Sequence, residues 1–425
     1  MADLRCEIAG VKSPNPFWLA SAPATDKEYN VTRAFKAGWG GAVWKTLGED
    51  PPIVNTTSRY GAISINNYRM AGFNNIELIS DRPLDVNLRE VKEMKRDWPD
   101  RAIVVSLMVP CEEESWKNIL ARVEETGADG VELNFGCPHG MSERGMGSAV
   151  GQVPEYIELV TRWCKKHTRM PVFVKLTPNV TNILGPARAA KKGGADAVSL
   201  INTINSIMSV DLDTMAPTPT VNGKGAHGGY CGPAVKPVAL HMVAEIARDP
   251  ECAGLPISGI GGIADWRDGA EFMSLGAGSV QVCTAVMHYG FKIVDDMIDG
   301  LGNWMDSAGH RTLDAFRGAA VKNYLDWGEL DMNYELIARI DQDACIRCGL
   351  CYIACEDTSH QSIAAQRVNG ERRYEIIEEE CVGCNLCMHV CPVEGCITMV
   401  PVDNGKPYTT WQEDPRNPEN IEAAE

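Results

Sequence analysis

Two runs of four cysteines near the C-terminus carry the strongest chemical signal in this sequence. The runs are Cys345-x2-Cys348-x2-Cys351-x3-Cys355 and Cys381-x2-Cys384-x2-Cys387-x3-Cys391. This spacing is typical of proteins with two [4Fe–4S] clusters, in which three close thiolates bind one cluster and the fourth binds the other. Zinc sites or a disulfide mesh are the alternatives, but zinc usually takes pairs of CxxC. Pro392 follows the second run as expected, whereas Glu356 follows the first. The runs therefore predict a relay of single electrons.

The composition describes a chain with a sizeable core and an acidic surface. Its 425 residues, 44% of them hydrophobic, suffice for one large and one small domain. The net charge of −17 argues against nucleic acid or an anionic membrane as partner. No signal peptide is visible, and no apolar stretch approaches the ~18 residues of a membrane span. We therefore expect thiol and cluster chemistry in a reducing cytoplasm.

Strand-like apolar runs alternate with amphipathic stretches of helical length before the cysteine runs. The eight apolar runs are 15–22, 40–46, 102–108, 130–135, 171–176, 197–203, 256–262 and 279–285. Eight strands with intervening helices predict an α/β fold of the (β/α)8 TIM barrel type, and a doubly wound sheet is the alternative. Polar residues and glycines gather at the C-terminal ends of the runs, where barrel enzymes build their active sites.

The organisation of the chain follows from these patterns. We assign residues 1–305 to the barrel, 306–335 to a helical linker, 336–403 to a ferredoxin-like domain with two clusters, and 404–425 to a polar tail. Segment 47–85 is too long for a plain connector, so it is predicted to be a functional excursion over the barrel rim. Lys45 and Lys175 each end an apolar run, where a buried lysine needs an anionic partner.

The ends of the last two apolar runs suggest a phosphate site. Gly261 and Gly262 end the seventh run, and Cys283 and Thr284 end the eighth. Barrels frequently bind phosphate between these two loops, although a glycine pair can also mark a tight turn. Beside a ferredoxin domain, the predicted ligand is flavin mononucleotide (FMN), because a flavin exchanges single electrons with clusters and hydride with organic substrates. Lys175 is assigned to the N1/O2 edge of the flavin, with a rim salt bridge as the alternative.

The glycine-rich loop at 134–147 is the sharpest catalytic candidate, and its glycines suit an active-site lid. Cys137 lies near its base. A free thiol with a pKa near ~8.5 is mostly protonated at neutral pH, so Cys137 could act as a general acid. A small buried cysteine is the alternative reading. His139 is a weaker candidate for the acid.

These runs, the loop NFGCPHGMSERGMG and the cysteine runs together resemble the dihydropyrimidine dehydrogenase family over residues 3–403, closest to its bacterial NAD-dependent catalytic subunits. The barrel alone resembles dihydroorotate dehydrogenase more distantly. The resemblance implies the reversible reduction of uracil and thymine to their 5,6-dihydro forms in pyrimidine degradation. Hydride would pass from FMN to C6 of the ring, and Cys137 would protonate C5.

The resemblance also implies the residues that contact each ligand. The pyrimidine would be held by Asn75, Asn134, Phe135, Gly136, Asn202 and Thr203. The FMN would be contacted by Ser21, Lys45, Thr46, Lys175, Gly232, Ile260, Gly261, Gly262, Cys283 and Thr284.

The sequence also bears on where the electrons come from. The sequence shows no Gly-x-Gly-x-x-Gly between a strand and a helix, so no dinucleotide fold is visible. The family resemblance therefore implies a partner subunit that carries FAD and binds NAD(H), in a hetero-oligomer such as a heterotetramer. Two alternatives stay open: a dihydroorotate dehydrogenase-like oxidoreductase, and an electron-relay module with an inactive barrel.

Overall fold

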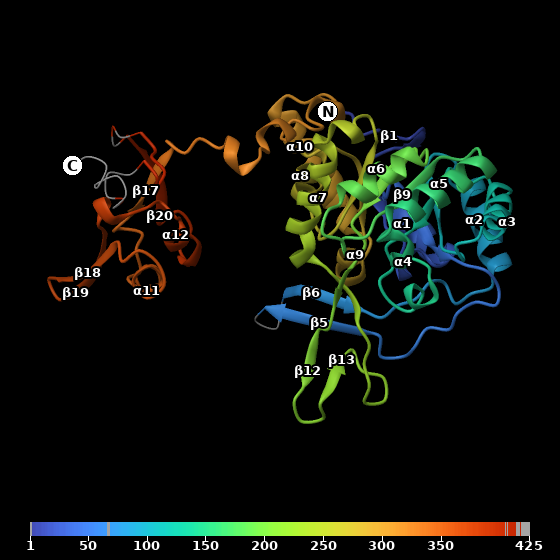
Figure 1. Ribbon diagram of the computed structural model, residues 1–425, viewed down its shortest axis with the longest axis horizontal. Coiled ribbons are helices and arrows are strands. Elements are labelled where there is room, and N and C mark those ends of the chain that lie inside the picture. Colours follow the sequence, from blue (N-terminus) through green and yellow to red (C-terminus); the bar gives the residue numbers. More distant parts are fainter. Residues whose placement is uncertain (1, 66–68, 404, 406, 414–416, 418–425) are drawn as a thin grey trace. The chain divides into compact units, whose positions relative to one another are not determined.

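The structure, a computed structural model, describes residues 2–65, 69–403, 405, 407–413 and 417. The chain divides into two compact units, Met1–Tyr324 and Leu325–Glu425, drawn with their elements labelled in Figure 1. No helix within the described ranges has the length and apolar character needed to cross a membrane.

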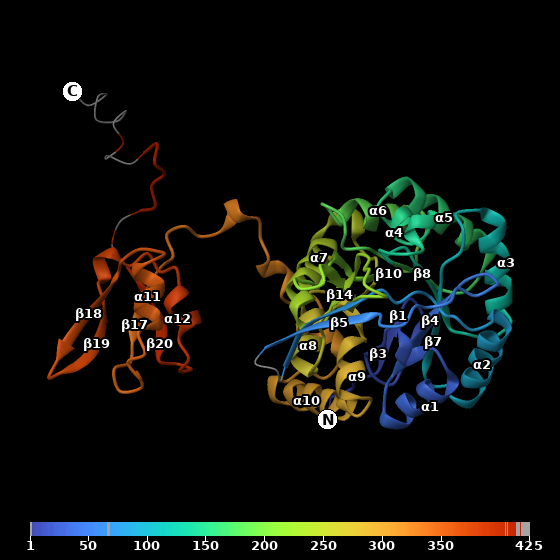
Figure 2. The same ribbon diagram turned by 90° about the horizontal axis from the view of Figure 1, so that it is seen from below.

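The first unit is built on a closed barrel of eight parallel strands, surrounded by helices (Figure 2). The barrel strands are β3 (Phe17–Leu19), β4 (Gly41–Leu47), β7 (Ala102–Leu107), β8 (Gly130–Asn134), β9 (Val172–Lys175), β10 (Ala197–Leu200), β15 (Ile257–Ile260) and β16 (Ala277–Val282). Each predicted apolar run overlaps one of them. The (β/α)8 barrel is therefore confirmed and the doubly wound sheet is excluded, since an open sheet leaves two strand edges unpaired.

The surrounding helices bury one apolar face against the strands. They include α1 (Glu28–Ala37), α2 (Leu84–Asp97), α3 (Glu113–Glu124), α5 (Pro154–His167), α6 (Leu184–Lys192), α7 (Lys236–Arg248), α8 (Trp266–Ser274), α9 (Thr284–Tyr289) and α10 (Ile293–Ala308). In α3 the buried Trp116, Ile119, Leu120 and Val123 recur at helical spacing. They share the main core with outward-facing strand residues such as Val131.

The barrel interior is layered from apolar to polar. At the N-terminal ends of the strands, Trp18, Val43, Val104 and Phe173 pack together with Ile8 and Val11. Ile8 and Val11 belong to a hairpin of β1 (Cys6–Ile8) and β2 (Val11–Ser13) that covers this end. Alternation along each strand then directs polar side chains inward in the middle and at the C-terminal end. The interior polar residues include Lys45, Glu132, Asn134, Lys175, Ser199, Ser258 and Gln281.

A four-stranded antiparallel sheet lies at the opposite end of the barrel from β1 (Figure 1). Its strands, in order, are β11 (Ile204–Ser206), β14 (Gly228–Cys231), β6 (Arg69–Asn75) and β5 (Tyr60–Ile65). A further hairpin, β12 (Ser209–Asp211) and β13 (Ala216–Thr218), projects beyond it. Because β5 and β6 come from segment 47–85, the predicted excursion over the rim is confirmed.

The predicted helix across 306–335 is wrong. Helix α10 ends at Ala308, because Gly309 adopts a left-handed conformation (φ 78°) that closes the helix. Single 3-10 turns follow: η5 (Leu313–Ala315), η6 (Val321–Asn323) and η7 (Trp327–Glu329). Along the chain, the boundary between the two compact units follows Tyr324, inside the predicted linker. The outer domain limits stay predictions, and most of the predicted tail at 404–425 lies outside the described residues.

The second unit combines two antiparallel strand pairs with two short helices. Strand β17 (Glu335–Ile340) pairs with β20 (Ile397–Val402), and β18 (Ile363–Val368) pairs with β19 (Glu371–Ile376). The helices are α11 (Leu350–Glu356) and α12 (Leu386–Val390). Its buried core is small and contains three cysteines: Ala338, Cys351, Ile363, Tyr374, Cys387, Cys396 and Ile397. A domain with so few apolar residues needs a metal or disulfides for stability.

Candidate active site and cluster sites

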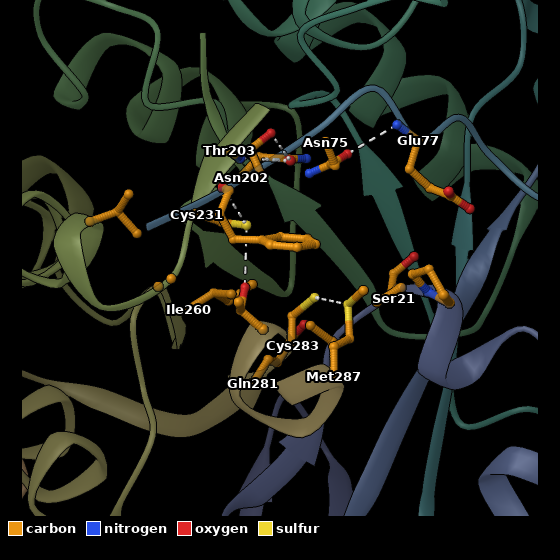
Figure 3. Close-up of a pocket in the computed structure, with 18 of the residues that line it drawn as sticks. Ser21, Asn75, Glu77, Asn202, Thr203, Cys231, Ile260, Gln281, Cys283 and Met287 are labelled. Carbon is orange, nitrogen blue, oxygen red and sulfur yellow. Dashed lines mark hydrogen bonds between the residues drawn. The ribbon is translucent and has the colours of Figure 1, made fainter. Parts of the chain in front are cut away.

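A cavity of about 1300 Å³ opens at the C-terminal ends of the barrel strands (Figure 3). All ten residues predicted to contact FMN line it, as do Cys137, Asn75, Asn134, Asn202 and Thr203. In Figure 3, Asn75, Asn202 and Thr203 lie on one side, across the cavity from Cys283 and Met287. The structure thus brings residues from the five barrel strands β4, β8, β9, β15 and β16 and from the rim sheet into one space.

Two of the predicted pyrimidine contacts, Phe135 and Gly136, do not line this cavity. Phe135 follows the inward-facing Asn134, so it turns outward and packs edge-on against Trp116, with 6.1 Å between ring centroids. Gly136 affects the cavity indirectly, through the position of Asn202. A Cβ built on Gly136 would lie 2.3 Å from the Cβ of Asn202. The missing side chain at Gly136 therefore makes room for Asn202.

Asn134 is the centre of a hydrogen-bond network at the cavity wall. Its Nδ2 donates to Oγ1 of Thr46 at 3.0 Å. Its Oδ1 accepts from Nδ2 of Asn202 at 3.1 Å and from the backbone N–H of Cys137 at 3.2 Å. The same amide thus fixes the orientation of Asn202 and the backbone that carries the thiol.

Both predicted lysines have the anionic partner that their burial requires. Nζ of Lys45 lies 2.5 Å from Oε1 of Glu77, and Nζ of Lys175 lies 3.4 Å from Oε1 of Glu132. The other oxygen of Glu77 accepts a hydrogen bond from the hydroxyl of Tyr60 at 3.0 Å and pairs with Arg59. Glu77 therefore ties the rim sheet to the barrel.

Cys137 is buried among Ile79, Met108, Met141 and Met146. Its thiol donates to the backbone carbonyl of His139, with Sγ 3.5 Å from the oxygen. Burial raises the pKa of Cys137 to about 11, so the thiol keeps its proton at neutral pH. This is the state that a general acid requires.

His139 does not compete well for the same role. Its Nε2 lies 2.9 Å from the backbone carbonyl of Glu77, to which the protonated nitrogen donates. Burial lowers the pKa of His139, so its neutral form is favoured. The hydrogen bond to the Glu77 carbonyl thus holds a neutral imidazole, which is a much weaker acid than the imidazolium form.

Three glycines shape the part of the cavity where a phosphate would be bound. Gly232, Gly261 and Gly262 have φ angles of 92°, 130° and 72°, which favour glycine. A Cβ on Gly262 would lie 2.8 Å from the Cβ of Lys236 and 3.0 Å from the carbonyl oxygen of Gly232. Helix α9 begins at Thr284 in the same wall. Bare backbone beside a helix start fits the phosphate of FMN.

Two smaller cavities in the second unit are lined by the cysteine runs. One, of about 310 Å³, is lined by Cys345, Cys348, Cys351 and Cys391. The other, of about 370 Å³, is lined by Cys355, Cys381, Cys384 and Cys387. In each, three thiols of one run meet the fourth thiol of the other, which is the crossed arrangement that fits two [4Fe–4S] clusters.

The comparisons with known proteins agree with this geometry. Residues 3–305 match the dihydroorotate dehydrogenase family, and residues 338–399 match the 4Fe-4S dicluster domain. The chain is 42% identical to the PreA subunit of NAD-dependent dihydropyrimidine dehydrogenase from Escherichia coli (strain K12), over 93% of this chain and 95% of that protein. The chain belongs to the dihydropyrimidine dehydrogenase branch of the dihydroorotate dehydrogenase family.

Further relatives of this dihydropyrimidine dehydrogenase family member match about three quarters of the chain. The chloroplastic dihydropyrimidine dehydrogenase (NADP(+)) of Arabidopsis thaliana is 39% identical over 76% of this chain and 78% of that protein. The catalytic subunit of dihydroorotate dehydrogenase B (NAD(+)) from Pyrococcus abyssi is 34% identical over 75% of this chain and 99% of that protein. A crystal structure of ligand-free dihydroorotate dehydrogenase from Eimeria tenella shares the fold, with a TM-score of 0.61 and 19% identity over 75% of this chain and 92% of that one.

Sequence reasoning missed several residues in the cavity of this dihydropyrimidine dehydrogenase family member. They include Tyr60, Phe73, Glu77, Cys231 and Gln281. Tyr60 and Phe73 stack at 5.2 Å between centroids, and both come from the excursion, which was recognised only by its length. Gln281 carried a usable signal, because it is a polar residue inside the apolar strand β16.

Proposed function

We propose that this protein reversibly reduces uracil and thymine to their 5,6-dihydro forms, with electrons that originate in NADH on a partner FAD subunit. The observation that carries the proposal is the single cavity in which the buried thiol of Cys137 meets the amides of Asn75, Asn134 and Asn202. When bound, the two clusters would deliver electrons singly and FMN would supply hydride to C6 of the pyrimidine.

The side chains suit a pyrimidine ring. Its edge alternates N–H and C=O groups, and an asparagine amide can donate and accept. Asn134 is held by Thr46 and the Cys137 backbone, so Asn202, hydrogen-bonded to it, has a fixed direction. Cys137, protonated at neutral pH, would then donate its proton to C5.

The charges in the cavity favour a neutral pyrimidine over dihydroorotate. Among the described residues that line it, the two ammonium groups are those of Lys45 and Lys175. Glu77 pairs with the first and Glu132 with the second. The carboxylate of dihydroorotate would want a dedicated cation, and both candidates already have a carboxylate partner.

The ten predicted FMN contacts and the two cysteine cavities would hold the cofactors of the proposed enzyme. The FAD and NAD(H) sites would lie on the partner subunit of a hetero-oligomer, of which a heterotetramer is one form. We place this assembly in the cytoplasm, since eight thiols that serve as cluster ligands require a reducing compartment.

The test is cofactor analysis after anaerobic purification, followed by uracil reduction with reduced viologen as the donor. We expect one FMN and about eight irons per chain, as two [4Fe–4S] clusters require, together with dihydrouracil formation. Stoichiometric zinc would contradict the cluster assignment. Clusters without FMN would instead indicate an electron relay with an inactive barrel.

Replacing Cys384 with alanine should remove one cluster and spare the barrel. The change deletes one of the four thiols that line the larger cysteine cavity. We expect iron content to fall by about half, with lower thermal stability of the second unit and unchanged FMN content. Cys111→Ser is the matched control, since this thiol lies outside both cysteine cavities. Full iron retention in Cys384→Ala would contradict the assignment of this thiol.

Gly136→Ala tests whether Asn202 holds the pyrimidine. The new methyl group would lie 2.5 Å from Nδ2 of Asn202 and displace it. Overpacking costs about 1–3 kcal/mol, so we expect KM for uracil to rise roughly tenfold or more, with FMN content unchanged. Gly302→Ala in helix α10, where a Cβ meets nothing within 4 Å, is the control. An unchanged KM would exclude Asn202 from substrate binding.

A further inference from the structure

The middle of the barrel contains polar residues where barrels usually hold bulky branched apolar side chains. Glu132, Ser199, Ser258 and Gln281 belong to this layer, and Glu132 is 0% exposed. Burial of a carboxylate is unfavourable unless it is paired and hydrogen-bonded. The contacts of Glu132 therefore need an explanation beyond packing.

The two oxygens of Glu132 have different surroundings. Oε2 accepts from Oγ of Ser199 at 2.8 Å and from Nε2 of Gln281 at 3.0 Å. Oε1 has no hydrogen-bond partner among the described residues and faces Nζ of Lys175 at 3.4 Å. Two neutral donors thus hold the carboxylate by hydrogen bonds to Oε2, while Oε1 interacts with the charge of the Lys175 ammonium group.

Glu132 lies directly beneath the cavity without lining it. Asn134 pairs with Lys175 across β8 and β9, and Glu132 pairs with Phe173, one inward position deeper. Lys175 and Gln281 line the cavity, whereas Glu132 does not. Below, Phe173 packs with Trp18 and Val43 in the apolar layer. The carboxylate therefore acts across a water-poor interior, where charges interact strongly.

We propose that Glu132 is a fixed counter-charge that weakens the positive field of Lys175 at the cofactor and so keeps the reduction potential of bound FMN low. The proposal rests on the proposed function, which places FMN in this cavity. A cation near the flavin stabilises the negative charge that the ring gains on reduction. A carboxylate 3.4 Å from that cation offsets part of its positive charge, so the negative charge of the reduced ring is stabilised less. Glu132 thus acts by its own charge, which offsets that of Lys175 at the flavin, although Glu132 does not line the cavity.

The test compares the FMN midpoint potentials of Glu132→Gln and Lys175→Met, measured by redox titration after saturation with FMN. Glu132→Gln should raise the potential, with the equilibrium between reduced and oxidised FMN shifting about tenfold, or about 30 mV for a two-electron couple. Lys175→Met should lower it. Asp249→Asn is the control, because this buried carboxylate pairs with Arg188 outside the cavity and its loss should leave the potential unchanged.

Shifts of the same sign in both variants, or no shift in Glu132→Gln, would overturn the proposal. Should Glu132→Gln fail to fold, the double variant Glu132→Gln/Lys175→Met must have a higher potential than Lys175→Met alone, and an equal or lower potential overturns the proposal. A wild-type chain that binds no FMN would contradict the proposed function. A wild-type chain that binds FMN, with variants of unchanged potential, contradicts only the role of Glu132.

Discussion

Replacing Cys137 with alanine is expected to lower the rate of uracil reduction roughly 10²–10⁴-fold, the usual contribution of a positioned general acid. FMN content and uracil affinity should stay near those of the wild type, because the network around Asn134 uses the backbone N–H of Cys137 and not its sulfur. Anaerobic turnover with reduced viologen, together with uracil titration of the oxidised protein, separates the loss of rate from a loss of binding.

Two further observations distinguish an acid from a packing residue. Cys137→Ser should be about as slow as the alanine variant, since an alcohol is a far weaker acid than a thiol. Burial raises the pKa of Cys137 to about 11, so the protonated form is present at neutral pH and is lost only as pH rises through that value. The thiol should therefore cause no decline in rate between about pH 7 and 9. Near-normal turnover of Cys137→Ala would redirect attention to His139.

The purified chain is expected to show no uracil-dependent oxidation of NADH, whereas it should reduce uracil with reduced viologen. No Gly-x-Gly-x-x-Gly stands between a strand and a helix in the sequence, so we expect the nicotinamide site on the partner. Adding the partner subunit with NADH should restore turnover, and part of the surface around the cysteine runs should become buried in the complex. Robust NADH oxidation by the chain alone would mean that it contains its own nicotinamide site.

The fold was predictable where local pattern determines structure. Each barrel strand coincides with an apolar run, because strands buried on both faces of a parallel sheet need few polar residues. The linker was mispredicted because its helical periodicity was given more weight than Gly309, which closes α10. The position of the rim segment 47–85 could be predicted, but its strand pairing could not. The pairing of β6 with β14 joins segments about 150 residues apart, and local sequence pattern does not encode such a contact.

The candidate site was predictable for residues at strand ends and for the cysteines. The spacing of the two runs predicts the crossed lining that places Cys355 and Cys391 in opposite cavities. Strand alternation could have excluded Phe135 from the pyrimidine contacts, because it follows the inward-facing Asn134. The same alternation could have identified Glu132 as an inward-facing residue, because it lies two positions before Asn134. Nothing local in the sequence marks Glu77, because its role depends on a lysine brought near by the fold.

The most direct test of the central claim is a single-turnover experiment. The FMN-loaded chain, reduced anaerobically by viologen, is mixed with uracil while flavin absorbance is followed and the products are analysed. Our account predicts that oxidised flavin returns and that 5,6-dihydrouracil forms in proportion to the reducing equivalents held, while orotate gives no product. Reduced, FMN-loaded protein that converts orotate but leaves uracil unchanged would contradict it.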